Sequence, residues 1–238
     1  MDKFNFFCIS VSPNLFPVSP EKGGFPFMIK HVIFDFDGTI VDSISLSIEL
    51  FNELADKYKF NKIVYNQLDY LRSLSFIERC RAVKVPLYKI PMLGIEITRN
   101  YRKIIGELRI FEGVYEVIHW LKEQGLELSI ISSNSNENVK AFLKENNIDV
   151  FDGIYCSRNL FGKEKIINRF IKKHNLEKDE VIYIGDEYRD IMACKINDVK
   201  VIAVSWGYDP LDMLIKAGPD FIVDSPPEII QFLSSRAS

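Results

Sequence analysis

The chain contains few cysteines and histidines, and it has no long apolar run. Its four cysteines, Cys8, Cys80, Cys156 and Cys194, are far apart in the sequence and form no C-x-x-C pair, and its three histidines are not clustered. This spacing is atypical of disulfide frameworks and of zinc sites. We therefore expect reduced thiols and a cytoplasmic protein.

Hydropathy and charge argue against two further classes of partner. No apolar stretch approaches the ~18 residues that a membrane-spanning helix needs, and the N-terminus lacks the basic start and apolar stretch of a signal peptide. The net charge of -3 leaves no basic excess of the kind that nucleic-acid-binding proteins carry. We expect neither a membrane nor a nucleic acid as partner, whereas a small anionic substrate stays open. The oligomeric state is not indicated.

The pattern of the remaining sequence predicts an α/β fold. From about residue 113 onward, strand and helix patterns alternate with short connections, which is typical of a Rossmann-like parallel sheet with helices on both faces. We expect strands at 32–34, 127–132, 153–156, 181–184, 200–204 and 221–223. Amphipathic periodicity predicts helices at 114–124, 137–146, 164–174 and 189–197. Asn136 is expected to cap the second of these helices.

The 238 residues are enough for a core domain with a smaller companion. Residues 43–110 show helical periodicity without a buried strand, so we expect a helical cap inserted after the first strand. The catalytic core is then formed by 28–42 and 111–238. Residues 1–27 are rich in proline and lack periodicity, and we expect an irregular, dispensable extension.

The first strand ends in an unusual way. Residues 32–34 read Val-Ile-Phe, a run typical of a strand that is buried on both faces, and Asp35 and Asp37 follow at once. A carboxylate there costs several kcal/mol unless it is paired or bound to a metal. Ligands of open α/β sheets bind beyond the carboxyl ends of the strands. These two aspartates are therefore the first candidates for catalysis.

Two other strand ends carry polar groups that should meet this pair. Ser132-Ser133-Asn134 follows the second strand, and Asp186 and Asp190 follow the strand at 181–184. Four carboxylates would then share a small volume, where each like-charged pair ~4 Å apart costs about 4 kcal/mol at an effective dielectric constant of about 20. The cluster therefore requires a cation. Oxygen ligands without histidine or cysteine indicate Mg²⁺.

Each of these features also has a structural interpretation. An Asp-x-Asp pair after a strand is often part of a loop or a helix cap, and Asp186 and Asp190 could be acidic residues at a helix N-terminus. Ser133 could be a helix cap, and Ser132 competes with it for a role in binding. Lys163 could be a solvated lysine. The full ordered set favours a functional site over these interpretations.

The ordered set resembles the four motifs of the haloacid dehalogenase-like hydrolases over about residues 28–225. The matching residues are Asp35-Phe36-Asp37-Gly38-Thr39, Ser133-Asn134, Lys163 and Gly185-Asp186-x-x-x-Asp190. The resemblance implies that Asp35 is the nucleophile and forms an aspartyl-phosphate. It implies that Asp37 protonates the leaving oxygen and then activates water.

The resemblance also implies roles for the other motif residues. Ser133, Asn134 and Lys163 would bind the phosphoryl group. Mg²⁺ would be held by the side chains of Asp35 and Asp186 and by the main-chain carbonyl of Asp37, and Asp190 would orient that shell. An acid at position 37 argues against carbon–halogen hydrolysis, since such relatives lack it.

Within the family, the chain is similar to the phosphoglycolate phosphatase type, through Gly-Asp-Glu-x-Arg-Asp at 185–190 and Ser-Trp-Gly-Tyr at 205–208. We expect a Mg²⁺-dependent phosphatase for a small phosphorylated metabolite. The alternatives are a phosphosugar mutase of the same family and a binding or regulatory protein without turnover. Arg72, Arg79, Arg81 and Lys84 could meet an anionic leaving group, but they are interpreted as part of a solvated face of the cap.

Overall fold

The structure is a computed structural model that describes residues 29–157 and 162–234. The expected extension at 1–27 and Cys8 lie outside the described residues, so the expectation that 1–27 is dispensable stays a prediction. No helix in the described part of the chain combines the length and the apolar character needed to cross a bilayer.

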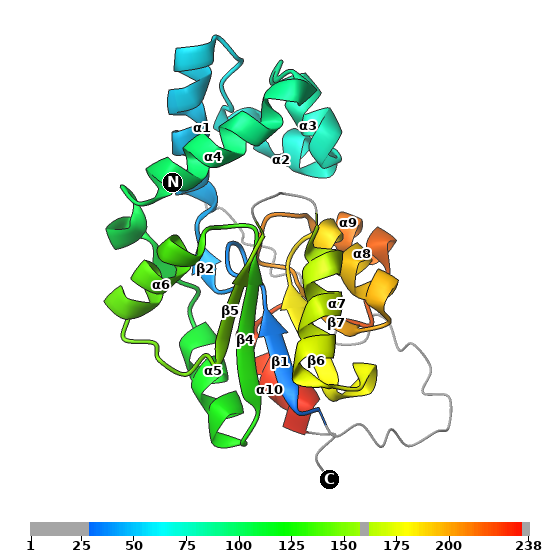
Figure 1. The fold of residues 1–238 in the computed structure, drawn as a ribbon. Helices are drawn as coiled ribbons and strands as arrows, with labels where there is room; N and C mark the ends of the chain where they lie inside the picture. Colours follow the sequence, from blue (N-terminus) through cyan, green and yellow to red (C-terminus); the bar gives the residue numbers. More distant parts are fainter. Residues whose placement is uncertain (1–28, 158–161, 235–238) are drawn as a thin grey trace, which may run out of the picture.

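The main sheet confirms the predicted α/β architecture (Figure 1). In the described ranges it has six parallel strands in the order β5-β4-β1-β6-β7-β8. The strands are β1 (His31–Phe34), β4 (Glu127–Ser132), β5 (Gly153–Cys156), β6 (Val181–Gly185), β7 (Lys200–Val204) and β8 (Phe221–Val223). This is the strand order of a Rossmann fold, in which β1 lies where the direction of the order reverses.

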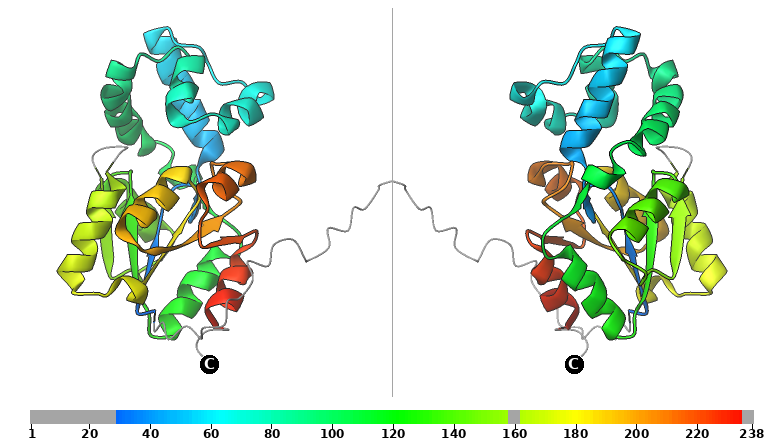
Figure 2. Two further views of the ribbon diagram at one scale, coloured as in Figure 1. Left: turned by 90° about the vertical axis from the view of Figure 1, so that its right-hand side faces the viewer. Right: turned by 90° about the vertical axis from the view of Figure 1, so that its left-hand side faces the viewer.

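Both faces of the sheet are covered by helices, as predicted (Figure 2). Val32 and Phe34 of β1 point to one hydrophobic cluster, and Ile33 points to the other. The first cluster packs against α5 (Val114–Glu123), α6 (Asn136–Glu145) and α10 (Pro226–Ser234). The second packs against α7 (Lys163–His174), α8 (Tyr188–Asn197) and α9 (Leu211–Ala217). Alternate residues of a strand face opposite sides, so the continuous apolar run supplies both clusters.

The start of α6 corrects one prediction. Ser135 is the N-cap, and its Oγ accepts a hydrogen bond from the Asn138 N–H at 3.2 Å. Asn136, the expected cap, is the first residue of the helix. A cap residue needs extended backbone, and Ser135 has it with φ -84° and ψ 150°.

Residues 43–110, the helical insertion, stand above the carboxyl ends of the strands (Figure 1). They contain α1 (Ile44–Tyr58), α2 (Leu68–Ser73), α3 (Phe76–Ala82) and α4 (Ile90–Tyr101), which enclose a hydrophobic cluster of their own. The chain enters and leaves through the antiparallel pair β2 (Val41–Asp42) and β3 (Arg109–Ile110). Short 3₁₀ helices lie at Tyr65–Gln67, Leu87–Lys89, Ile105–Glu107 and Lys178–Glu180.

Candidate active site

Asp35 lies directly beyond the end of β1 and is only 4% exposed. Its N–H donates to the carbonyl of Ile184 at 2.8 Å, which extends the pairing of β1 with β6 by one residue. One carboxylate oxygen accepts the N–H of Phe36 at 2.7 Å, and the other lies 2.7 Å from Nζ of Lys163. Burial raises the pKa of Asp35, and the charge of Lys163 offsets part of that rise.

Lys163 is the first residue of α7 and is buried, so the interpretation as a solvated lysine is wrong. Its ammonium group forms ion pairs with Asp35 and Asp190. Burial lowers the pKa of Lys163, but the charges of Asp190 and Asp35 outweigh burial and raise it overall. The lysine is therefore a permanent cation beside the Asp35 carboxylate.

Asp37 receives hydrogen bonds from two distant parts of the chain. The hydroxyl of Tyr101, at the end of α4, donates to its Oδ1 at 2.5 Å, and Nδ2 of Asn134 donates to its Oδ2 at 2.9 Å. Burial raises the pKa of Asp37, and these hydrogen bonds lower it by less. A raised pKa suits a carboxyl group that must donate a proton. Local sequence pattern carries no signal for Tyr101, because its contact with Asp37 spans 64 positions.

Asp186 follows β6 and is fully buried. The hydroxyl of Thr39 donates to one of its oxygens at 2.7 Å, and the N–H of Tyr208 donates to the other at 2.7 Å. A Cβ at Gly38 or at Gly207 would overlap the Asp186 carboxylate, and Gly38 also has φ +81°. The two glycines therefore allow the main chain to enclose this carboxylate. Burial, followed by the charge of Asp35, raises the pKa of Asp186.

Glu187 is a site residue that the sequence reasoning did not single out. Carboxylate oxygens of Asp35, Glu187 and Asp190 all lie within 4.8 Å of one another. Glu187 also accepts hydrogen bonds from Arg189 at 2.5 and 2.8 Å. Its position next to Asp186, at the end of a buried strand, was the available signal.

The acidic cluster fits a divalent cation. Asp35, Asp186, Glu187 and Asp190 supply four carboxylates, whereas the cations paired with them, Lys163 and Arg189, supply two positive charges. When all are ionised, two negative charges are left. The donors are all oxygen atoms, which Mg²⁺ prefers. The acidic triad consists of Asp35, Glu187 and Asp190. The predicted ligands are Asp35, Asp186 and the main-chain carbonyl of Asp37, so the two sets share Asp35.

The two serines after β4 have different partners. Ser132 Oγ accepts the N–H of Asn134 at 3.0 Å, so it is engaged within its own turn. Ser133 Oγ is buried and, among the described residues, has no hydrogen-bond partner. An unpaired buried hydroxyl costs free energy unless a ligand completes it. This difference favours Ser133 over Ser132 as a ligand-binding group. Asn134 contacts Asp37, and its role in phosphate binding stays a prediction.

The interpretation of Arg72 and Arg79 as solvated residues is wrong. Arg72 donates to the carbonyls of Tyr208 at 2.8 Å and Gly207 at 2.6 Å, and Arg79 donates to Asp209 at 2.5 Å. Both arginines join the helical insertion to the loop after β7. Charge patterning separates polar faces from apolar faces, but it does not show which polar face another part of the chain covers.

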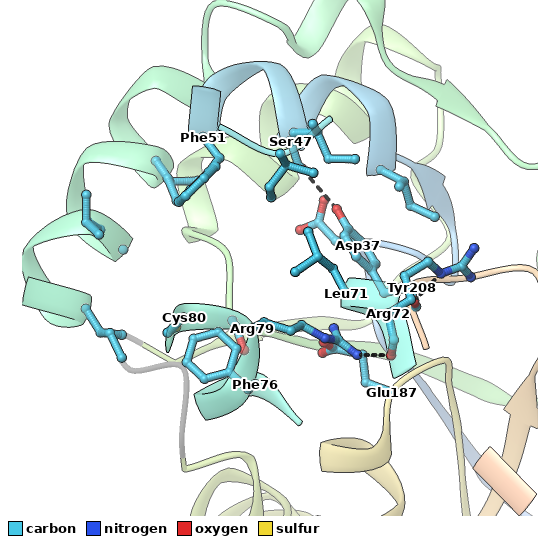
Figure 3. A pocket seen from close by; sticks show the side chains of 18 of the residues that line it. Asp37, Ser47, Phe51, Leu71, Arg72, Phe76, Arg79, Cys80, Glu187 and Tyr208 are labelled. Carbon is cyan, nitrogen blue, oxygen red and sulfur yellow. Dashed lines mark hydrogen bonds between the residues drawn. The ribbon is translucent and has the colours of Figure 1, made fainter. Parts of the chain in front are cut away.

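A pocket of about 370 Å³ lies between the core and the helical insertion. Asp35, Asp37 and Ser133 line its core side. Figure 3 shows Asp37 and Glu187 together with Phe51, Leu71 and Phe76, which the insertion contributes. The pocket therefore brings Asp35 and Glu187 of the acidic cluster together with side chains of the insertion.

Comparison with known proteins identifies the relatives of this chain. The family model for haloacid dehalogenase-like hydrolases matches residues 32–204, which confirms the resemblance. A phosphoglycolate phosphatase from Synechococcus elongatus is 27% identical over 85% of this chain and 96% of its own length. The pyrophosphatase PpaX from Bacillus mycoides is 24% identical over 87% of this chain and 97% of its own length. The structure of a haloacid dehalogenase-like hydrolase from Streptococcus pneumoniae superimposes with a TM-score of 0.73 at 23% identity, covering 87% of this chain and 99% of that one.

Proposed function

Because the chain belongs to the haloacid dehalogenase-like hydrolase family, we propose that it is a Mg²⁺-dependent phosphatase that hydrolyses a small phosphomonoester through an aspartyl-phosphate. The observation that carries this proposal is the pairing of a buried carboxylate, Asp35, with a buried lysine at 2.7 Å. Two residues farther along, Asp37 supplies a second carboxyl group whose pKa is raised by burial. Nucleophile and acid thus line one pocket, and the positive charge of Lys163 lies 2.7 Å from the nucleophile.

The first step transfers the phosphoryl group to the protein. A carboxylate oxygen of Asp35 attacks phosphorus, and the bond between phosphorus and the ester oxygen breaks. Protonated Asp37 gives its proton to that oxygen, so that an alcohol leaves. Lys163 and Ser133 stabilise the phosphoryl oxygens while the charge redistributes.

The second step restores the protein. Asp37, now a carboxylate, takes a proton from water as the water oxygen attacks phosphorus. The bond between Asp35 and phosphorus breaks, which releases phosphate and regenerates both side chains. In the structure Tyr101 and Asn134 each donate to one oxygen of Asp37, which leaves a lone pair on each oxygen for the proton that Asp37 transfers.

We place Mg²⁺ beside Asp35 and Asp186, with the main-chain carbonyl of Asp37 as a third ligand. The bound ion would supply positive charge that lowers the repulsion between the Asp35 carboxylate and the phosphate. The excess of two negative charges around Asp35 supports this placement. Asp190 acts on the same site indirectly, because it holds Lys163.

We further propose that residues 43–110 act as a cap over a core formed by 28–42 and 111–238. The β2–β3 pair, where the helical insertion begins and ends, supports these boundaries. A cytoplasmic location is supported by the described cysteines Cys80, Cys156 and Cys194, which are free thiols.

Phosphoglycolate is the first named substrate to test, because it is in the name of the Synechococcus relative. The experiment measures hydrolysis of p-nitrophenyl phosphate by the full chain, with Mg²⁺ added and then chelated. We expect turnover that needs the ion and that is lost in Asp35→Asn. The matched control is Asp56→Asn. Asp56 is exposed, and its ion-pair partner in the described part of the chain is Lys62.

Each rival function has a distinct result in this experiment. Normal turnover in Asp35→Asn would remove the nucleophile from the proposal. Absence of turnover with every phosphomonoester, with Mg²⁺ present, would favour a binding or regulatory protein. A mutase would convert a sugar phosphate into its isomer without releasing inorganic phosphate.

A further inference from the structure

The pocket has two chemically different ends. At the core end, Asp35, Asp37 and the unpaired hydroxyl of Ser133 provide the polar groups that phosphate chemistry requires. At the other end, the helical insertion contributes aliphatic and aromatic side chains, including Ile48, Phe51 and others of α1 and its neighbours. A phosphoryl group placed at Asp35 therefore directs the rest of the substrate toward an apolar wall.

The apolar end belongs to the interior of the helical insertion. Leu71, Cys80, Val83 and Leu93 line the pocket, and all four are also members of the insertion's buried hydrophobic cluster. A ligand that enters this space contacts groups that are otherwise covered by protein. Polar atoms placed there would lose their hydrogen bonds to water, whereas methylene groups would gain free energy on burial.

The cations that line the pocket, among the described residues, all have partners. Arg72 donates to two main-chain carbonyls, Arg79 pairs with Asp209, and Arg189 pairs with Glu187. Arg79 or Arg189 would have to leave Asp209 or Glu187 to neutralise a second anionic group on the substrate, whereas the partners of Arg72 are neutral carbonyls that leave its charge in place. Beyond Arg72, the side chains that the insertion contributes to the pocket are mostly apolar, so a carboxylate placed against them loses its hydrogen bonds to water.

We infer that the alcohol released by this enzyme is predominantly apolar, with an alkyl chain or aryl ring that occupies the end of the pocket lined by α1, α2, α3 and α4. This inference rests on the proposed phosphatase function and specifies its substrate class. It ranks small, doubly charged esters such as phosphoglycolate as poor substrates.

Gly94 of α4 provides a direct way to test the occupant of the pocket. It lines the pocket, and a Cβ built on it meets no atom within 4 Å. Leucine is a better helix former than glycine, so Gly94→Leu should keep the helix while it fills empty space. The matched control is Ile95→Leu, because Ile95 is the next residue and is 60% exposed.

The experiment measures kcat/KM for straight-chain alkyl phosphates from ethyl to octyl, and for phosphoglycolate. We expect kcat/KM to rise about fourfold for each added methylene, equivalent to about 0.8 kcal/mol, until the chain fills the pocket. Phosphoglycolate should be a poorer substrate than propyl phosphate. In Gly94→Leu the rise should stop at a shorter chain, and in Ile95→Leu it should follow the wild type.

A flat or falling series, or a preference for phosphoglycolate, would overturn the inference while leaving the phosphatase function intact. An unchanged series in Gly94→Leu would also overturn it. If Gly94→Leu does not fold, the wild-type series decides alone. A chain that releases phosphate from no ester, p-nitrophenyl phosphate included, would instead remove the proposed function on which the inference depends.

Discussion

Asp37 is a residue at which the helical insertion and the core meet. Tyr101 donates to it from α4 of the insertion, and Asn134 donates to it from the turn after β4 of the core. Burial raises the pKa of Asp37, whereas the two hydrogen bonds stabilise its ionised form. The acidity of this group therefore depends on a contact with the insertion.

We predict that Tyr101→Phe moves the alkaline limb of the kcat/KM profile to higher pH. The substitution removes a hydrogen bond that lowers the pKa of Asp37. The pKa of Asp37 then rises further, and the acid stays protonated, as the first step requires, to a higher pH. The profile with p-nitrophenyl phosphate between about pH 5 and 9 measures the shift. We also expect a loss of about 1 kcal/mol in the free energy of unfolding.

Tyr88→Phe is the control for that variant, because Tyr88 belongs to the same insertion and is 80% exposed. It should reproduce the wild-type profile. If Tyr101→Phe left the alkaline limb in place, Asp37 would not be the acid that this limb reports.

At the scale of elements, the strands and core helices could be predicted because local pattern and burial agree. The apolar runs at 127–132 and 200–204 are strands β4 and β7 with the predicted bounds. The periodic segment at 114–124 is α5. The helix ends at Glu123, one residue earlier than predicted, and Gly125, which has φ +80°, follows the cap residue Gln124. In α5 the buried residues are those that the helical period places on one face, whereas consecutive residues of β4 and β7 are buried, on both faces of the sheet.

The contacts that build the site were less accessible, because they join elements that are distant in sequence. The Tyr101 hydroxyl and the Asp37 carboxylate are neighbours only because α4 returns over the end of β1. The sequence around Arg72 is typical of a surface cation. In the structure Arg72 donates to two main-chain carbonyls of the loop after β7. Periodicity reports which face of an element is buried, and it carries no information about which partner buries it.

The pairing of β1 with β4 supports a prediction about stability and pH. His31 of β1 is fully buried, and its Nε2 lies 2.9 Å from Ser129 Oγ of β4. Burial lowers the pKa of His31 from the usual 6.5, and the charge of Glu127 offsets part of this effect. Between the two pKa values the unfolded chain binds a proton that the folded chain does not, so stability falls as pH drops below about 6.5.

We expect His31→Gln to reduce this loss, since glutamine can contact Ser129 but does not titrate. Urea unfolding at pH 7.5, 6.5 and 5.5 gives the free energy of unfolding of both proteins. The value for the wild type minus the value for His31→Gln should decrease toward low pH. Carboxyl groups that do not interact with His31 contribute equally to both curves and cancel in the difference. Parallel curves for the two proteins would contradict the assignment to His31.

At the scale of the whole molecule, the site joins two hydrophobic cores through charged groups. The core supplies the acidic cluster, and the insertion supplies Arg72 and Arg79, which bind the loop that also contacts Asp186 through Tyr208. Like charges at the junction oppose folding when no cation neutralises them. A cation bound there should consequently stabilise the fold as a whole.

We therefore predict that Mg²⁺ raises the melting temperature. An ion that binds only the folded state adds about 2.7 kcal/mol at 100 times its Kd, which for a chain of this size is a rise of roughly 5 to 11 °C. EDTA should reverse the rise. Asp186→Asn should abolish it, whereas Asp198→Asn should retain it, because Asp198 is exposed and pairs with Lys178. The readout is the change on adding Mg²⁺, so the intrinsic stability of each variant cancels. If Mg²⁺ raised the melting temperature of Asp186→Asn as much as that of the wild type, the ion would bind elsewhere. If Mg²⁺ did not raise the melting temperature of the wild type, the charges of the acidic cluster would be compensated without the ion.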